Sequence, residues 1–225
     1  MDRPPPRVLA HRGASGYELE NTLAAFRRAV TMGADGVELD VHSTRDGELV
    51  VHHDPDVPGP GPIASLTLAQ LSRHRLANGE RIPSLEEALA AVGALTVWVE
   101  VKALPEAHDA RLVGVLREGP APGRYGVHSF DHRLVRRIGQ AAAEFRTGIL
   151  LTSRLIDPVA AMRAAGASVL WQEWQMIDAE LVNAVHEHGG EVIAWTVNER
   201  AAAEKLNALG VDGLCGNFPD RLRIS

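Results

Sequence analysis

The sequence predicts a (β/α)8 barrel, an α/β fold, for this chain of 225 residues. Short β-branched runs alternate with Ala-, Leu- and Arg-rich segments of helical period, which is typical of repeated βα units. Eight such runs can be distinguished, and eight parallel strands with intervening helices close into a barrel. We therefore expect residues 1–225 to form a single domain. An open, doubly wound sheet is the alternative, but the segment 11–16 does not match the glycine-rich nucleotide pattern that would favour it.

The expected elements follow one another regularly along the chain. The strands cover residues 8–11, 36–41, 96–101, 125–130, 147–151, 168–172, 191–197 and 213–216. Helical patterns cover residues 22–32, 84–92, 107–117, 132–142, 158–165, 179–188 and 200–209. Capping residues precede three of these helices, at Asn21, Asp131 and Asp157. Glycines stand where four of them should end, at Gly33, Gly166, Gly189 and Gly210.

One apolar run, residues 49–52, does not fit the alternation. Only a few residues, with Asp46-Gly47 at their centre, separate it from the preceding strand, whereas a parallel crossover needs about a dozen or more. We therefore expect an antiparallel return, a β-hairpin turned by Asp-Gly after the second strand. This return would deliver His53 to the C-terminal end of that strand. The Pro/Gly-rich segment 58–62 is expected to be a short, exposed inserted loop.

The composition excludes several classes of partner. A formal net charge of −6 argues against nonspecific binding to nucleic acid and implies that local features, such as a bound cation, attract any anionic substrate. The single cysteine, Cys215, rules out an intramolecular disulfide and a Cys-rich metal site, and we expect it to be a small core residue. We expect no signal peptide and no stable membrane insertion, hence a cytoplasmic location. The sequence does not predict the oligomeric state.

Three acidic residues occupy strand positions that should be buried. In the strand 36–41 the side-chain period of two places Glu38 and Asp40 on the face opposite the apolar residues, which is the interior of a barrel. Glu100 takes the same position in the strand 96–101. Carboxylates this close are costly unless they are protonated, paired or bound to a cation, and such oxygen ligands suit Ca²⁺ or Mg²⁺. The alternative is an ion-pair network in which Arg12 and Lys102 neutralise the acids.

Two histidines are expected at the same end of the barrel. His11 ends the first strand, and His53 ends the antiparallel return. Histidine is the usual proton carrier near neutral pH. A divalent metal, two acid–base groups and the cations Arg12 and Lys102 together suit hydrolysis of an anionic ester, with phosphate as the natural candidate. Five other histidines are assigned to ordinary core or surface positions, namely His74, His108, His132, His186 and His188.

A series of short motifs runs along nearly the whole chain. The segments are His11-Arg12-Gly13, Glu20-Asn21-Thr22, residues 36–41, Asp46-Gly47, His53-Asp54, residues 99–102, Ser129-Phe130-Asp131, residues 195–198, residues 210–213 and Phe218-Pro219. In this order the motifs resemble those of the glycerophosphodiester phosphodiesterases. Single pieces such as His-Arg-Gly are weak signals, but the ordered set is highly specific. The resemblance implies a TIM barrel.

The resemblance also implies a cofactor and a reaction. It implies a divalent metal ion, Ca²⁺ or Mg²⁺, held by Glu38, Asp40 and Glu100, and it assigns general acid–base catalysis to His11 and His53. The implied reaction cleaves a small glycerophosphodiester to glycerol 3-phosphate and an alcohol. In the implied route the free hydroxyl of the glycerol attacks phosphorus, while one histidine removes its proton and the other protonates the leaving alcohol. This attack forms a cyclic phosphate of glycerol, which water then opens to glycerol 3-phosphate.

The substrate would be held by residues around the metal. The resemblance implies that Arg12 and Lys102 bind the phosphate and that Glu20 lies near the metal. Trp195 would line the barrel mouth and flank the glycerol moiety, with plain core packing as the alternative for this side chain.

Two segments depart from the family pattern. Residues 55–66 are short and Pro/Gly-rich where the family usually carries a longer segment that caps the substrate site, so the alcohol is not assigned. Gly216 stands where the family typically has threonine and lacks its hydroxyl, while Asn217 can fill the polar role beside it.

Three other functions are considered. Phospholipase D-like cleavage of lysophospholipids would use the same site and an apolar trough, which the short loop could open. A non-catalytic barrel that binds a phosphorylated ligand should have lost a histidine or a metal carboxylate, and all five are present. A metal-dependent aldolase or isomerase would lack the paired histidines.

Overall fold

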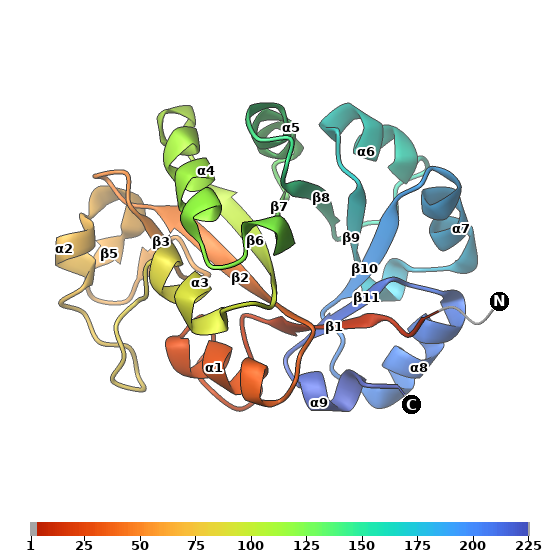
Figure 1. Cartoon of the computed structure of the whole chain (residues 1–225), viewed down its shortest axis with the longest axis horizontal. Helices are drawn as coiled ribbons and strands as arrows, with labels where there is room; N and C mark the ends of the chain where they lie inside the picture. Colours follow the sequence, from red (N-terminus) through yellow and green to blue (C-terminus); the bar gives the residue numbers. More distant parts are fainter. Residues whose placement is uncertain (1–3, 225) are drawn as a thin grey trace.

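Eight parallel strands enclose the centre of the molecule in the computed structural model, which describes residues 4–224 (Figure 1). They are β1 (Arg7–His11), β2 (Gly36–Ser43), β6 (Thr96–Ala103), β7 (Tyr125–Ser129), β8 (Arg146–Leu151), β9 (Val169–Glu173), β10 (Glu191–Trp195) and β11 (Gly213–Gly216). Neighbours in this order pair in parallel, and β1 pairs with both β11 and β2, so the sheet closes. The predicted (β/α)8 barrel is confirmed, and the closure excludes the open sheet.

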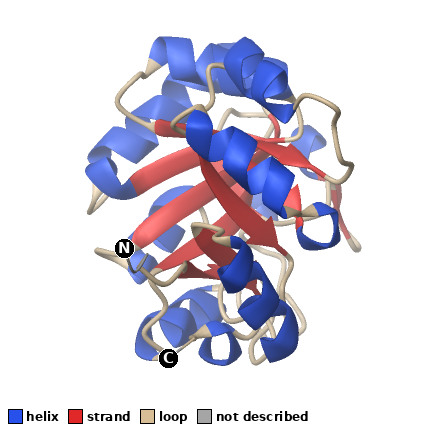
Figure 2. Ribbon diagram, turned by 90° about the vertical axis from the view of Figure 1, so that its right-hand side faces the viewer, coloured by secondary structure: helices blue, strands red, loops and turns tan. Residues whose placement is uncertain are grey.

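Helices surround this barrel (Figure 2). They are α1 (Leu23–Thr31), α2 (Leu68–Leu71), α3 (Leu85–Val92), α4 (Asp109–Glu118), α5 (His132–Ala141), α6 (Pro158–Ala165), α7 (Ala179–Glu187), α8 (Arg200–Leu209) and α9 (Pro219–Leu222). The predicted helix 107–117 begins as a 3₁₀ turn and becomes α-helical at Asp109. The sequence does not predict α2 and α9, because four residues are too few to show a helical period. Within residues 4–224 no helix is long and apolar enough to cross a membrane.

The strand period of two separates an apolar outer face from a mixed interior. Val37 and Leu39 of β2 belong to the same buried cluster as Phe26 of α1, so they hold the helices on the barrel. Glu38 and Asp40 alternate with them and are buried outside that cluster, as the sequence predicts. Two polar side chains of one strand therefore enter the interior of the barrel.

Aromatic side chains fill part of the barrel interior. The indole rings of Trp98 and Trp171 lie 5.4 Å apart in an edge-to-face arrangement. They form one buried cluster with Leu9, Ile193 and Cys215. Cys215 is thus the core residue that the sequence predicts.

Helix α1 begins one residue later than its end signals predict. Thr22, not Asn21, is the N-cap, and its hydroxyl accepts a backbone N–H of the first turn at 3.2 Å. Asn21 instead adopts the left-handed conformation with φ +56° and donates from its amide to Oδ2 of Asp40 at 2.7 Å. A competing buried hydrogen bond therefore takes Asn21 away from the helix. The predicted caps Asp131 and Asp157 are confirmed.

The antiparallel return is also confirmed. Strand β3 (Leu49–Val51) pairs antiparallel with the end of β2 and carries the chain to His53. The inserted loop is exposed at its tip, as predicted, but it is more ordered than a plain loop. It contains the two-stranded hairpin of β4 (Asp56–Val57) and β5 (Gly61–Pro62), followed by a 3₁₀ turn whose Ile63 is buried. Ile63 and Val57 belong to a small buried cluster with Val50 of β3, and this cluster anchors the loop to the antiparallel return.

Candidate active site

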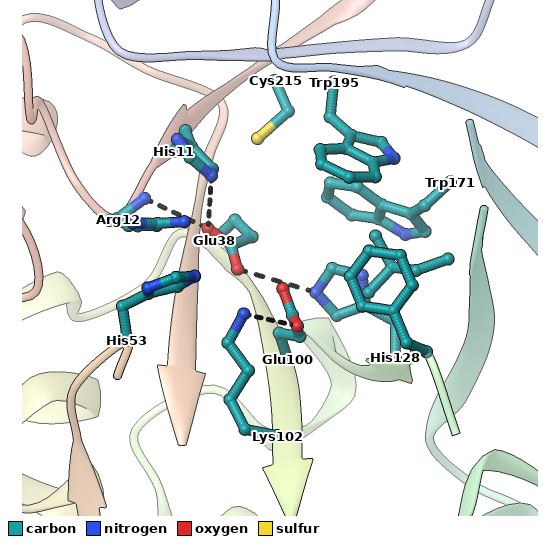
Figure 3. A pocket seen from close by; sticks show the side chains of 12 residues that line it. His11, Arg12, Glu38, His53, Glu100, Lys102, His128, Trp171, Trp195 and Cys215 are labelled. Carbon is teal, nitrogen blue, oxygen red and sulfur yellow. Dashed lines mark hydrogen bonds and ion pairs between the residues drawn. The ribbon is translucent and has the colours of Figure 1, made fainter. Parts of the chain in front are cut away.

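A pocket lies among the carboxyl ends of the barrel strands and holds all the candidate side chains except Glu20 and Asp40 (Figure 3). It is lined by His11, Arg12, Glu38, His53, Glu100, Lys102, His128, Phe130, Leu150, Trp171, Trp195 and Cys215. The pocket encloses about 360 Å³ of empty space, part of which is open solvent. Charged side chains on or just after β1, β2 and β6 form one wall. Aromatic rings on or just after β7, β9 and β10, namely Phe130, Trp171 and Trp195, form the opposite wall.

A sharp turn after β1 brings the main chain against the acids. Arg12 has φ +55° and Gly13 has φ +80°, both in the left-handed region. A Cβ at Gly13 would lie 2.7 Å from the Cβ of Ala25, so only glycine fits there. The turn aims the backbone N–H of Arg12 at Oε2 of Glu38, at a distance of 3.1 Å. The His-Arg-Gly motif thus has a conformational reason for its glycine.

Asp40 is the most fully compensated of the three acids. One of its oxygens lies 2.9 Å from Nζ of Lys102, and the other lies 3.1 Å from Nε of Arg12. Burial would raise the pKa of this carboxyl, but Lys102 and Arg12 outweigh it and lower the pKa below its usual range. The ion-pair alternative considered for the sequence therefore describes Asp40 correctly.

The same ion pairs leave Glu38 without a countercharge in contact. Its Oε1 is buried and has no hydrogen-bond partner among residues 4–224. Burial, followed by repulsion from Asp40 and Glu100, raises the pKa of Glu38 well above its usual range. Burial also raises the pKa of Glu100, although Lys102 lies 2.7 Å from it. With all three acids ionised, the cluster would carry more negative charge than Arg12 and Lys102 offset.

A divalent cation would supply the missing positive charge. One oxygen each of Glu38, Asp40 and Glu100 lie within 4.8 Å of one another. Three carboxylate oxygens form the donor set that hard cations such as Ca²⁺ and Mg²⁺ prefer. The uncompensated Glu38 and this donor set fit the predicted metal site.

His11 is held as a neutral ring beside the acids. Its Nδ1 lies 2.7 Å from Oδ1 of Asn217, and its Nε2 lies 4.0 Å from Oε2 of Glu38. Burial, and then the charge of Arg12, lower the pKa of His11 to about 4. The unprotonated ring can therefore accept a proton at physiological pH.

The other predicted residues surround this centre. His53 is partly exposed, and its Nδ1 lies 2.7 Å from Oδ1 of Asp54. Glu20 receives a hydrogen bond from the guanidinium of Arg12 at 2.9 Å, so it borders the site through that residue. Trp195 lines the pocket in edge-to-face contact with Phe130, with ring centroids 5.6 Å apart. Trp195 thus lines the pocket and also packs against the buried cluster of Trp98 and Trp171.

His128 is a further member of the site, which the sequence did not predict. It is the Cα partner of Glu100 across the β6–β7 pairing, and its side chain is 1% exposed. Burial lowers the pKa of its imidazole well below the usual range. The signal was available, because His128 alternates with the outward-facing Val127 as Glu38 alternates with its apolar neighbours.

Gly216 and Asn217 explain the departure near the C-terminus. A Cβ at Gly216 would lie only 1.8 Å from the carbonyl oxygen of Val197, so this chain has no room for the threonine of the family. The backbone N–H of Asn217 donates to Oδ1 of Asn198 at 2.9 Å. The side chain of Asn217 is thereby directed at His11.

The closed barrel, with acids, cations and histidines in a pocket at the carboxyl ends of its strands, has the architecture of a (β/α)8 enzyme. Residues 11–221 match the model of the glycerophosphoryl diester phosphodiesterase family. The chain belongs to this family and is a phosphoric diester hydrolase. This assignment sets aside the non-catalytic barrel and the aldolase or isomerase.

Individual relatives agree with the family assignment. The chain is 33% identical over 232 residues to a glycerophosphodiester phosphodiesterase of Caldanaerobacter subterraneus, covering 96% of this chain and 95% of the relative. It resembles the structure of an Oleispira antarctica phosphodiesterase in complex with the product sn-glycerol-3-phosphate, with a TM-score of 0.88 and 25% identity over 97% of this chain and 95% of that one. A glycerophosphodiester phosphodiesterase of Thermotoga maritima shares the fold, with a TM-score of 0.82, 24% identity and 97% coverage of each chain.

Proposed function

We propose that this chain hydrolyses glycerophosphodiesters to glycerol 3-phosphate and an alcohol in a metal-dependent reaction. The observation that carries the proposal is the uncompensated Glu38 among three converging carboxylates, with two histidines in the same pocket. The glycerol 3-phosphate bound by the Oleispira antarctica relative supports the choice of product. A cytoplasmic location stays a prediction.

Glu38, Asp40 and Glu100 would hold the divalent ion, Ca²⁺ or Mg²⁺. When bound, such an ion supplies positive charge for the phosphate oxygens and for the charge that develops on them. The chain itself contributes orientation, because Arg12 and Lys102 fix the carboxylate of Asp40.

Arg12 and Lys102 would bind the phosphate. Lys102 has three N–H donors and contacts two carboxylates, those of Asp40 and Glu100. At least one donor therefore remains for a phosphate oxygen. Arg12 likewise has five donors and contacts Asp40 and Glu20 with some of them. Trp195, with Phe130, would form the apolar side of the glycerol subsite.

The partners of the two histidines support a division of roles. The oxygen of an amide only accepts hydrogen bonds, so Asn217 favours the tautomer of His11 with its proton on Nδ1. Nε2 of His11 then has a free lone pair and would act as the base that takes the proton of the attacking glycerol hydroxyl. The carboxylate of Asp54 lies 2.7 Å from Nδ1 of His53 and orients this ring, which would act as the acid that protonates the leaving alcohol.

A test of the proposal measures glycerol 3-phosphate released from a panel of glycerophosphodiesters after treatment with EDTA and after readdition of Mg²⁺ or Ca²⁺. We expect release to stop with EDTA and to return with one of the two ions. Full release in EDTA would contradict the metal dependence, and no release from any diester would contradict the substrate class. Lysophosphatidylcholine in the same panel tests the phospholipase D-like alternative, which predicts that it is cleaved faster than glycerophosphocholine.

A further inference from the structure

His128 is a buried polar side chain that the proposed reaction does not use. Neither of its ring nitrogens has a hydrogen-bond partner in the part of the chain that the structure describes. Its ring lies 4.2 Å from that of Trp171 and 5.6 Å from that of Trp98, measured between centroids, so its orientation is fixed by packing. An apolar ring would fill this place without burying two unpaired nitrogens, so the histidine calls for an explanation.

The ring is aimed at the acidic cluster (Figure 3). Nε2 of His128 lies 3.8 Å from Oε1 of Glu38, which is itself buried without a partner among the described residues. Two unpartnered polar atoms therefore face each other in the barrel interior. A movement of about 1 Å would bring them to the usual N–H···O distance of about 2.9 Å.

Glu38 is the acid that needs such a partner. Asp40 and Glu100 are each held by a cation, through Arg12 and Lys102. Glu38 has a backbone N–H on its Oε2 and, within residues 4–224, no hydrogen bond on its Oε1. The rotation of its carboxylate is thus defined from one side only.

We propose that His128 is a positioning residue whose Nε2–H donates to Oε1 of Glu38 and fixes this carboxylate for cation binding. Nε2 can carry the proton whether the ring is neutral or charged, and a carboxylate oxygen that accepts one hydrogen bond keeps a second lone pair. The inference rests on the proposed metal-dependent function. Groups that orient a metal ligand in this way change metal affinity by about 10- to 100-fold when they are removed.

The test measures cation binding directly, by isothermal titration of the metal-free protein with Mg²⁺ and with Ca²⁺. His128→Phe keeps a ring between the two indoles and removes both nitrogens. His128→Gln keeps an N–H donor. We expect the Kd of His128→Phe to rise about 10-fold or more, and that of His128→Gln to stay within about threefold of the unsubstituted protein. The rate of diester hydrolysis by His128→Phe should recover at saturating cation, because the reacting groups are unchanged.

Trp98→Phe is the matched control. It alters the packing against His128 and leaves every polar group of the cluster in place, so its Kd should stay within about twofold. Should circular dichroism show that His128→Phe is unfolded, His128→Leu takes its place in the comparison.

The outcomes separate this inference from the proposed function. Unchanged affinity in His128→Phe, with clear binding by the unsubstituted protein, overturns the positioning role alone. Equal weakening in His128→Gln and His128→Phe also overturns it, in favour of packing. If the unsubstituted protein binds neither cation and keeps full activity in EDTA, the metal dependence fails and this inference fails with it.

Discussion

Oδ1 of Asn217 lies 2.7 Å from Nδ1 of His11, and this contact joins the loop after β11 to the end of β1. Asn217 is itself held by Asn198, whose side chain accepts its backbone N–H at 2.9 Å. The orientation of His11 therefore depends on two loops that are distant in sequence. Because an amide oxygen only accepts, the contact also selects which ring nitrogen is free.

Asn217→Ala should impair catalysis without unfolding the protein. Removing the acceptor frees the ring of His11 to rotate and to change tautomer, so we expect kcat to fall by about 10- to 100-fold with little change in KM. Steady-state kinetics on a glycerophosphodiester check this, and circular dichroism checks the fold. An unchanged kcat would contradict the role given to the contact.

Asn217→Asp is the second variant of this position and tests the pH dependence. Burial and Arg12 lower the pKa of His11 to about 4, and a carboxylate at position 217 would stabilise the charged ring and raise that pKa. A base must be unprotonated, so the acidic limb of the kcat/KM profile should move to higher pH in this variant. A limb that stays in place would show that it belongs to another group.

The two histidines should each be required for turnover. We expect His11→Ala and His53→Ala to lower kcat by about 10²- to 10⁴-fold, because each removes one proton-transfer group. The kcat of the double variant should be only slightly lower than that of the less active single variant, since the two groups act as a unit. His132→Ala is a control, because His132 lies outside the pocket and contacts the carbonyl of Leu150. Full activity in either single variant would refute the acid–base assignment.

The barrel strands could be predicted because the physical causes of strand position are local. The period of two places Glu38 and Glu100 inside the barrel, and the short Asp46-Gly47 connection admits only an antiparallel return. Cap choice at α1 could not be predicted, because Asn21 is drawn to Asp40, a residue far along the chain. Local signals suffice wherever no distant partner competes for the residue.

Which residues belong to the site could be predicted better than how each is charged and hydrogen-bonded. The strand period gives Glu38, Asp40 and Glu100 equivalent positions. Arg12 and Lys102 nevertheless compensate the charge of Asp40, whereas Glu38 is repelled by its acidic neighbours. Which acid a cation reaches is decided by tertiary geometry, and no spacing encodes it. His128 differs, because its strand period placed it inward and only its unpaired state required the structure.

Glu38→Gln should stabilise the metal-free protein while it abolishes activity. Burial and the neighbouring acids raise the pKa of Glu38 well above its usual range. The folded state therefore binds more protons than the unfolded state, and stability is complete below the unfolded pKa of about 4.3 and falls as pH rises through the folded pKa. Glu38→Gln has no ionisable group at this position and does not lose stability in this way. At neutral pH its free energy of unfolding should therefore exceed that of the unsubstituted protein by an amount on the order of 1 kcal/mol.

Urea titrations of both proteins in EDTA, at several pH values, measure this difference. The difference in free energy of unfolding between Glu38→Gln and the unsubstituted protein should widen as pH rises. In a second series with Mg²⁺ in place of EDTA, this difference should narrow or reverse, because the bound cation stabilises the protein that retains the Glu38 ligand. A gap that is independent of pH would mean that Glu38 is not the titrating group.

Gly216→Thr, which introduces the residue typical of the family, should harm this protein. The Cβ of a threonine at this position would lie 1.8 Å from the carbonyl oxygen of Val197. That carbonyl belongs to the backbone, and the N–H of Val197 is tied to Cys215 at 2.8 Å, so the strain cannot be relieved by a side-chain rotation. We expect a loss of about 3 kcal/mol in the free energy of unfolding, at the upper end of overpacking effects.

Gly114→Ala in α4 is the matched control, because a Cβ added at Gly114 would meet no neighbouring atom within 4 Å outside its own helix turn. Replacing this helical glycine should raise the free energy of unfolding by about 0.5–1 kcal/mol. Urea unfolding of both variants decides the point. Equal stability of Gly216→Thr and the unsubstituted protein would mean that the two loops move apart easily, and the fixed orientation of Asn217, which depends on their close approach, would then have to be abandoned.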